Sequence, residues 1–420
     1  MKGNLKWILC AMVIAGIVAA PMFMATPASA DKLSEAIQQG ISDGKIEKGD
    51  EPGFLGIPGA PDVNYIIGFL WAIWVGWIFS TVGAFGGIMA GVGHITIFGL
   101  GDYAKGFGKG YPMNKLLTDS IRVSNQWLVG LSGLISSTNY FRMGRLVAPL
   151  GMCLAIGGVG GSWLVPELTA GKISLKAYIG YFGIAVLALG IILFRETTKA
   201  GQAKRKKSKE AAASFEKASK EGGDTKEGVK VLQGSWPLMF IALMVVVASA
   251  LWINLVEGTQ WVAYALVFIG WILTFFVGTI RFTFYGVEFD FKAFIPMLGG
   301  IFIAALASFL GVGGGFLYVP FLTSVAGLPM FLVAGTSALV VLVGMIVSIF
   351  SYMVGKGVVI QWAFIGAELV GIFIGSMIGP RTSKYIPEVW LKRLFVVLAF
   401  YVGIRYITKG FLGYSIVPPF

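Results

Sequence analysis

The feature that most constrains this chain is a series of apolar runs, most of them close to the length of a membrane-spanning helix. They recur from Tyr65 to Leu412, and about 20 apolar residues are needed for an α-helix to cross a bilayer. Runs spread this widely exclude a soluble protein with a single anchor. Only 13% of the 420 residues are charged, against roughly 25% in soluble domains. The sequence therefore predicts an all-α polytopic membrane protein.

The beginning of the chain resembles an export signal. Residues 1–30 contain two early lysines, an apolar stretch and an Ala-Ser-Ala end, which is the layout of a bacterial secretory signal. An uncleaved N-terminal helix is the alternative, and both interpretations place Asp31 outside the cytoplasm. Residues 31–63 are polar and rich in Gly and Pro, so we expect a short periplasmic segment there.

Twelve apolar segments follow, and the charges between them predict how the chain crosses the membrane. The segments lie at about 66–83, 85–100, 116–137, 147–165, 174–194, 236–256, 260–280, 293–311, 313–328, 331–354, 361–380 and 391–411. Eleven of the 33 Lys and Arg residues fall between Arg195 and Lys230, and short loops this basic stay on the cytoplasmic side. With Asp31 outside, the loop is cytoplasmic only if the short segment 85–100 also crosses. This orientation explains the basic loop, and we expect no nucleic-acid partner.

Two parts of the chain resemble each other, which indicates an internal repeat. FLGVGGGFL (309–317) has a degenerate partner in STVGAFGGI (80–88), and residues 351–379 have a partner in 137–164. Each repeat holds five segments, an odd number, so the two repeats have opposite orientations in the membrane. Many secondary transporters have this architecture, with the binding site between the repeats.

The predicted fold is therefore two inverted repeats of about five membrane segments, each with a short Gly-broken segment, plus an inserted helix pair. The expected parts are a signal peptide or N-terminal helix (1–30), a periplasmic segment (31–63), a first transmembrane repeat (64–194), a basic cytoplasmic loop (195–235), the helix pair (236–280) and a second transmembrane repeat (293–412). We expect the loop to be a solvated helix or disordered.

The stretch from Phe309 to Ser337 is the strongest pointer to a site. It is apolar, yet six glycines and two prolines interrupt it. Irregular backbone survives at membrane depth only against protein or a water-filled cavity. Interrupted hydrophobic segments are therefore a sequence signature of a transporter's binding site.

The same residues carry a resemblance to a known family. G-V-G-G-G-F-L-Y-V-P, then A-G-T-S, a G-K-G turn and G-x-x-x-G-S resemble the TauE/SafE family of anion exporters. The resemblance is specific in 293–411 and weak in 66–194, and we expect 195–280 and the first 63 residues to lie outside it. It implies a multi-pass protein of the bacterial inner membrane that exports sulfite, sulfoacetate or a related anion without ATP.

Glycines are the first candidate site residues. Successive glycine N–H groups can form an anion-binding concavity, and Gly313, Gly314 and Gly315 are consecutive. Gly86 and Gly87 hold the corresponding positions in the first repeat. The alternative is that these glycines only allow helices to approach closely. For the later Gly371 and Gly375, close packing is the favoured interpretation.

Hydroxyl groups and one arginine are the next candidates. Thr336 and Ser337 could donate hydrogen bonds to an anion, or could bond to carbonyl oxygens of their own helix. Ser120 corresponds to them in the first repeat. Arg122 lies inside an apolar segment, where an ionised side chain is a functional hypothesis by default. Anion attraction by Arg122 and pairing with Asp119 both remain open.

Glu368 is the one acid deep within an apolar segment. A carboxyl group in a membrane can bind and release a proton near neutral pH, so we predict that it couples transport to protons. A protonated carboxyl bonded to a neighbouring helix is the alternative. His94 is the only histidine, and no Cys, Asp or Glu cluster accompanies it, so we expect a satisfied polar group and no metal site.

Together these observations favour a secondary transporter of a small anion, coupled to the ion gradient. No Walker-type G-x-x-x-x-G-K-[ST] motif is present, and we expect no cofactor. The alternatives are an intramembrane enzyme, although no H-E-x-x-H or G-x-S-x-G motif supports one, and a structural subunit whose basic loop binds a partner. The expected partners are the anion and the lipid bilayer, and homo-oligomerisation stays open.

Overall fold

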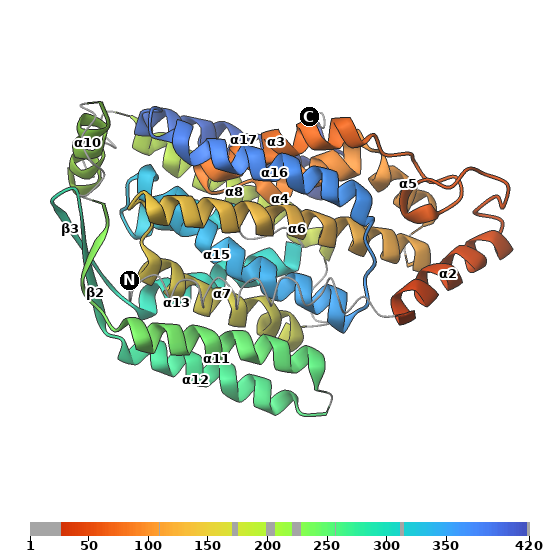
Figure 1. Cartoon of the computed structure of the whole chain (residues 1–420), viewed down its shortest axis with the longest axis horizontal. Helices are drawn as coiled ribbons and strands as arrows, with labels where there is room; N and C mark the ends of the chain where they lie inside the picture. The colour runs from red at the N-terminus through yellow and green to blue at the C-terminus, as the bar shows by residue number, and fades with distance from the viewer. Residues whose placement is uncertain are drawn as a thin grey trace.

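The protein is a bundle of helices elongated along the helix axes (Figure 1). This computed structural model describes residues 27–108, 110–169, 175–198, 206–220, 228–256, 258–310 and 315–417. Helix α10 and strands β2 and β3 lie at one end of the bundle, and helices α2 and α5 lie at the other (Figure 1). Residues 1–26, which hold most of the predicted signal peptide, lie outside the described part.

Within the described residues, five helices are long and apolar enough to cross a membrane. They are α3 (Tyr65–Val82), α11 (Trp236–Leu255), α15 (Met330–Phe350) with a π-helical turn to Gly355, α16 (Trp362–Ser383) and α17 (Glu388–Phe411). The bundle is completed by α6 (Pro112–Arg142), α7 (Ala148–Thr169), α8 (Leu175–Thr197), α12 (Gln260–Phe276) and α13 (Phe294–Leu310). The prediction of a helical multi-pass membrane protein is confirmed.

Helix α16, from the late part of the chain, packs along α3 with backbones in contact. A Cβ atom at Gly371 or Gly375 would overlap the carbonyl oxygens of Phe69 and Ile73, respectively. The contacts advance together along both helices, so α3 and α16 run parallel. The interpretation of these two glycines as packing residues is therefore correct.

Helices α7 and α13 form a second interface of the same kind. Gly157 and Gly161 leave no room for a Cβ atom beside the backbones of Met297 and Ile301, and here too the contacts advance in parallel. These two glycines are the sequence partners of the two on α16. Small residues of this spacing let helix backbones approach closely in membranes, where packing drives association.

Two further pairs run antiparallel. On α6 and α15, Gln126 bonds to Ser348 and Arg122 bonds to Tyr352, so the contacts advance along one helix and retreat along the other. Helix α8 packs on α17, and Gly183 contacts Gly403 and Ile407.

The predicted first and second repeats each correspond to a region with a broken segment of two short pieces. The first is α4 (Gly86–Val92) followed by a π-helical turn (Gly93–Ile97), and the second is α14 (Gly315–Pro320) followed by a π-helical turn (Phe321–Val325). Pro320 cannot donate the backbone hydrogen bond that a continuing helix needs. Before α4, Gly83 and Phe85 have positive φ angles of 75° and 68°, which a regular helix does not allow.

The first broken segment returns across the bundle. Tyr140, near the end of α6, donates a 2.6 Å hydrogen bond to the carbonyl of Ser80, near the end of α3. The two helices therefore end at the same side, and the chain between them reverses direction through α4 and α5 (Leu100–Gly106). This reversal is what the charge count requires of segment 85–100.

One end of the bundle carries a small sheet that we did not expect from the sequence. Strands β1 (Lys230–Gln233), β2 (Thr279–Phe284) and β3 (Val287–Lys292) pair antiparallel in that order. Ile280, Phe282 and Phe284 are buried while the residues between them are more exposed. This period of two is the signature of a half-buried strand. The fold is thus helical with a three-stranded addition rather than purely α.

Helix α10 (Lys206–Lys220) in the basic loop packs on this sheet and on the bundle. Phe215 is buried, with its ring centroid 4.4 Å from that of Phe331 and 5.9 Å from that of Phe284. Arg145 is only 2% exposed and lies beneath the ring of Phe215. Residues 206–220 are therefore a helix, which is one of the two expected alternatives, but one face of it packs on the bundle instead of being fully solvated.

The opposite end carries the polar N-terminal segment. It begins with α2 (Pro27–Ser42) and continues to α3 through a short 3₁₀ turn at Phe54–Gly56. Lys45 donates a hydrogen bond to the carbonyl of Phe107, and Tyr111 donates one to Asp43. The segment is therefore tied to the chain between α5 and α6.

Candidate functional site

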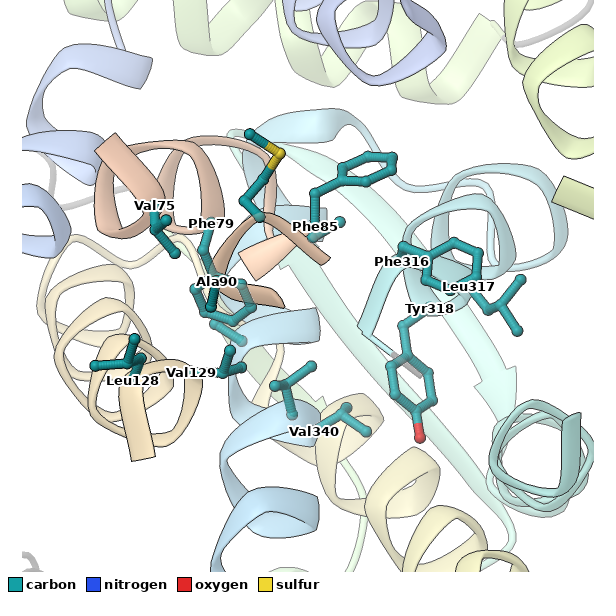
Figure 2. Close-up of a cluster of buried hydrophobic side chains, with 14 of the residues drawn as sticks. Val75, Phe79, Phe85, Ala90, Leu128, Val129, Phe316, Leu317, Tyr318 and Val340 are labelled. Atoms are coloured by element: carbon teal, nitrogen blue, oxygen red, sulfur yellow. The ribbon is translucent and has the colours of Figure 1, made fainter. Parts of the chain in front are cut away.

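A cavity of about 600 Å³ lies where the first broken segment meets α6, α15 and α17. Its apolar floor is formed by Phe79, Phe85 and Phe316, which belong to a buried cluster between the two broken segments (Figure 2). Exposed Lys105 and Lys409 line its other end. The cavity therefore runs inward from the end of the bundle that carries the N-terminal segment.

Most of the charged side chains that line the cavity are cationic. Lys105 and Asp102 come from α5, Arg122 from α6, and Arg405 and Lys409 from α17. Asp102 is the single carboxylate among the lining residues, and Lys105, 2.7 Å away, holds the pKa of its carboxyl group below the usual range. A cavity lined by one sign of charge concentrates ions of the opposite sign. This cavity is suited to an anion.

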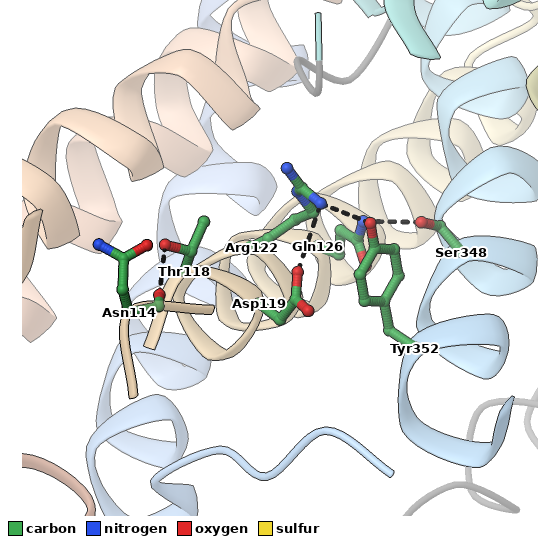
Figure 3. Close-up of polar contacts among 7 residues, drawn as sticks. All are labelled: Asn114, Thr118, Asp119, Arg122, Gln126, Ser348 and Tyr352. Carbon is green, nitrogen blue, oxygen red and sulfur yellow. Dashed lines mark hydrogen bonds and ion pairs between the residues drawn. The ribbon is translucent and has the colours of Figure 1, made fainter. Parts of the chain in front are cut away.

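Arg122 is held at the centre of a polar cluster on α6 and α15 (Figure 3). Its Nη1 atom lies 2.5 Å from the hydroxyl oxygen of Tyr352 and 3.5 Å from a carboxylate oxygen of Asp119. One turn further along α6, Gln126 donates a 2.6 Å hydrogen bond to Ser348. Arg122 keeps 34% of its side-chain surface exposed and lines the cavity. The two interpretations of Arg122 are therefore compatible, because it pairs with Asp119 and still faces the cavity.

A buried chain of hydrogen bonds leads from the cavity to Glu368. Asn125 lines the cavity, and its Oδ1 atom lies 2.6 Å from Nδ1 of His94. The other ring nitrogen of His94 lies 2.8 Å from a carboxyl oxygen of Glu368. His94 and Glu368 are each 1% exposed. The acid that we singled out from the sequence is therefore bonded to the lone histidine.

The predicted site residues fall into four groups. Gly86, Gly87, Gly315 and Arg122 line the cavity. Thr336, Ser337 and Ser120 are buried but do not line it, and Gly313 and Gly314 lie outside the described residues. Glu368 reaches the cavity only through His94 and Asn125.

The hydroxyl groups of α15 are occupied by backbone groups. Thr336 donates to the carbonyl of Leu332 at 2.7 Å and accepts from the N–H of Val147 at 3.1 Å. Ser337 donates to the carbonyl of Gly83 at 2.9 Å. Ser337 also lies 3.2 Å from the carbonyl of Ala334, so both hydroxyls make the bonds of the structural alternative, to carbonyls of their own helix. Ser120 has no hydrogen-bond partner among the described residues.

Sequence reasoning missed several cavity residues. Arg405 and Lys409 lie four positions apart, so they share a face of α17, and Arg405 donates a 2.8 Å hydrogen bond to Tyr401. Ionised residues in an apolar run were the signal that could have identified them. Asn125 and Lys105 gave no comparable signal, because only the folded chain places them beside the cavity.

Part of the chain is similar to known membrane proteins. Residues 225–406 match the sequence model of the family described as "Sulfite exporter TauE/SafE". The match includes α11 and α12, so the expectation that 195–280 lies outside the resemblance was wrong from residue 225 onward. No solved structure matches the chain significantly.

A curated relative supports the same assignment. A protein of Methanocaldococcus jannaschii described as a "probable membrane transporter protein" is 34% identical over 116 residues. The aligned part is 26% of this chain and 43% of that relative, so the chain matches less than half of the relative's length. Residues 225–406 are thus similar to the TauE/SafE family, and the curated relative is described as a membrane transporter.

Proposed function

We propose that this protein is a secondary transporter of the bacterial inner membrane that exports a small anion. The anion is sulfite, sulfoacetate or a related sulfur-containing or organic anion. The observation that carries the proposal is the cavity of about 600 Å³ beside the first broken segment, with four cationic side chains and one carboxylate in its lining. The family match supports transport, and the charge of the lining supports the sign of the substrate.

The proposed anion site combines cationic and backbone groups. Arg122 supplies a guanidinium group, whose fixed fork of N–H donors suits sulfonate and carboxylate oxygens. Gly86, Gly87 and Gly315 leave the backbone accessible from the cavity, so that amide groups near them can approach an oxyanion. Arg405 and Lys409 add positive charge along the path to the open end.

The proposed mechanism uses two inverted repeats. The parallel pair α3 and α16 has a counterpart in α7 and α13, and the pairs α6 with α15 and α8 with α17 run antiparallel. These directions support opposite orientations of 64–194 and 293–412. In transporters of this kind, one repeat rocks against the other around a central site.

Glu368 is the proposed coupling group. Its carboxyl oxygen is buried against His94, and His94 and Asn125 lie between it and the cavity. The free-energy cost of charging a group that is buried at membrane depth depends on the partner to which the group is bonded. Protonation of the pair can therefore depend on whether the cavity holds an anion.

Flux measurements with the purified full-length protein in lipid vesicles test the proposal. The panel is sulfite, sulfate, thiosulfate and sulfoacetate, each measured with and without a pH gradient. We expect saturable flux of at least one anion above the leak of protein-free vesicles. If none of the four anions moves faster than that leak, the proposed function is wrong.

Replacing the coupling acid gives a second test. Glu368→Gln should abolish the response of flux to a pH gradient while the protein stays folded, because glutamine keeps the shape and a hydrogen bond to His94 but cannot ionise. Gel-filtration behaviour and Tm check folding. A variant that responds to the pH gradient as strongly as the original protein would exclude Glu368 as the coupling group.

A further inference from the structure

The amide of Asn125 lies between the buried His94–Glu368 pair and the cavity. Its Oδ1 atom faces His94, whereas its Nδ2 atom makes no hydrogen bond to a described residue. Nδ2 lies beside Gly91, which also lines the cavity. Asn125 is three positions after Arg122 on α6, so both side chains are on the same face of the helix. An anion held by Arg122 is thus within reach of this amide nitrogen.

The orientation of the Asn125 amide is tied to the number of protons that the pair holds, and the arrangement with Oδ1 toward His94 corresponds to one protonation state. A carbonyl oxygen only accepts hydrogen bonds, so Nδ1 of His94 carries a hydrogen toward Asn125. The 2.8 Å contact between Nε2 and Glu368 needs a second hydrogen between those two atoms. The pair therefore holds two protons and has no net charge, whichever partner owns the shared proton.

When the His94–Glu368 pair loses one proton, the Asn125 amide must turn over. A neutral imidazole has one N–H group, and beside an ionised Glu368 that group must be Nε2–H, because a lone pair facing a carboxylate is repelled. Nδ1 then becomes an acceptor and needs a donor. Asn125 supplies one only if its amide turns over, which places Oδ1 instead of Nδ2 toward the cavity.

We propose that Asn125 links anion binding to proton binding, so that the anion and one proton occupy the transporter together. With the pair protonated, Asn125 offers an N–H donor to the anion. With the pair deprotonated, it offers an oxygen, which repels the anion. Because linkage is reciprocal, a bound anion favours protonation of the pair to the same extent. This inference rests on the proposed function and adds to it the direction of coupling: proton and anion move the same way.

Two ion pairs lie on the helices beside His94, while Lys115 and Arg142 lie near the two ends of α6 and Tyr103 and Tyr140 are neutral phenols. These pairs are Asp102 with Lys105 on α5 and Asp119 with Arg122 on α6. Helix α4 has no ionisable side chain and α3 has only Tyr65. Within the described residues, Glu368 on α16 is the ionisable group in contact with His94. The proton that this inference concerns is therefore the one shared by His94 and Glu368.

The direction of proton movement during anion efflux tests the inference. Vesicles with the full-length protein are loaded with sulfoacetate and the pH dye pyranine, with equal K⁺ on both sides and valinomycin to hold the membrane potential at zero. Sulfoacetate efflux should raise the internal pH, with about one proton leaving per anion. Efflux with a fall in internal pH, or with no change, overturns the inference and leaves the proposed function intact. Failure of all four anions to move overturns both.

Variants identify the group responsible. Asn125→Ala should still pass sulfoacetate, more slowly, but with a proton-to-anion ratio near zero, and His94→Gln should give the same low ratio. Asn114→Ala is the matched control, since Asn114 also lines the cavity but its amide bonds to the backbone carbonyl of Ala104. It should keep the original ratio even where its flux falls. An Asn125→Ala protein with the original ratio excludes Asn125 as the link.

Discussion

The two broken segments are similar in form but differ in their surroundings. Each is a short helix followed by a π-helical turn. The first lies beside Asn125, Arg122 and the His94–Glu368 pair. Close to the second, the cavity is lined by apolar side chains such as Phe316, Val341 and Met345. The two halves thus share a backbone plan, while the polar chemistry is concentrated beside one of them.

The interfaces between long helices show the opposite behaviour. Gly157 and Gly161 let α7 approach the backbone of α13 closely. Gly371 and Gly375 let α16 approach the backbone of α3 in the same way. In both halves, glycines at corresponding positions allow two helices to pack closely. The polar groups of the two halves, in contrast, differ. The comparison separates residues that build the scaffold from the polar residues that we propose bind the anion.

Large substitutions in the α3–α16 and α7–α13 interfaces should prevent folding to the same extent. This is the largest effect that we expect. Gly371→Leu and Gly157→Leu each force a side chain into a neighbouring backbone, where overpacking costs about 1–3 kcal/mol or more. Both variants should give little folded protein by gel filtration in detergent. Gly366→Leu, on the same helix as Gly371 but with open space at its Cβ position, should fold normally. If only one of the two interface variants fails, the equivalence of the interfaces is wrong.

Among the polar groups beside the first broken segment, we expect Arg122 to have the largest effect on flux. Arg122→Leu should lower sulfoacetate flux about 10- to 100-fold, because a charge-assisted hydrogen bond is worth roughly 1.5–3 kcal/mol. Asp119→Asn should leave flux unchanged or raise it, since it removes only the competing partner. Initial rates in vesicles measure both. Equal losses in the two variants would mean that Arg122 serves only to pair with Asp119.

The hydroxyl groups of α15 should affect stability without affecting transport. Thr336→Val leaves the buried N–H of Val147 without its acceptor, which costs about 1–3 kcal/mol. We expect a lower Tm, measured by thermal unfolding in detergent, with unchanged flux per folded molecule. A loss of flux at unchanged Tm would instead return Thr336 to the substrate site.

The smallest expected effect is at the exposed end of the cavity. Lys105 is 69% exposed, so its attraction for an anion is screened by salt. Lys105→Gln should raise the KM for sulfoacetate by less than about threefold in low salt, consistent with the small energies of exposed charges. The difference should vanish in high salt. A rise in KM that persists there would indicate direct contact with the anion.

Much of the fold could be predicted because the bilayer imposes simple rules. Length and hydropathy identified the helices, and charge bias required segment 85–100 to cross. The sheet was missed because β1 is a short strand at the end of a basic loop and its partners Ile280–Phe284 adjoin a long apolar helix. The packing of α10 was missed because it rests on three small or aromatic side chains, Ala211, Ala212 and Phe215, in an otherwise charged stretch.

The site was harder to predict than the fold. Arg122 was identified because ionised side chains are rare in membrane segments, and the glycines were identified because they are adjacent to one another. The pairing of His94 with Glu368 spans 274 positions, and no local pattern can show which distant helices bring two side chains together. Thr336 and Ser337 were misleading because a hydroxyl that bonds to a carbonyl and one that binds a ligand look alike in sequence.

The parallel packing of α3 and α16 has a consequence for how the protein is made. Ser80 on α3 and Gly375 on α16 lie 295 positions apart, and ribosomes add about 5–20 residues per second. Helix α3 therefore waits roughly 15 to 60 s in the bilayer before its permanent neighbour is synthesised. During that interval, the face of α3 that will pack on the glycines of α16 contacts lipid or temporary partners. Variants that delay the insertion of α16 prolong this exposure, although they change nothing in α3 itself.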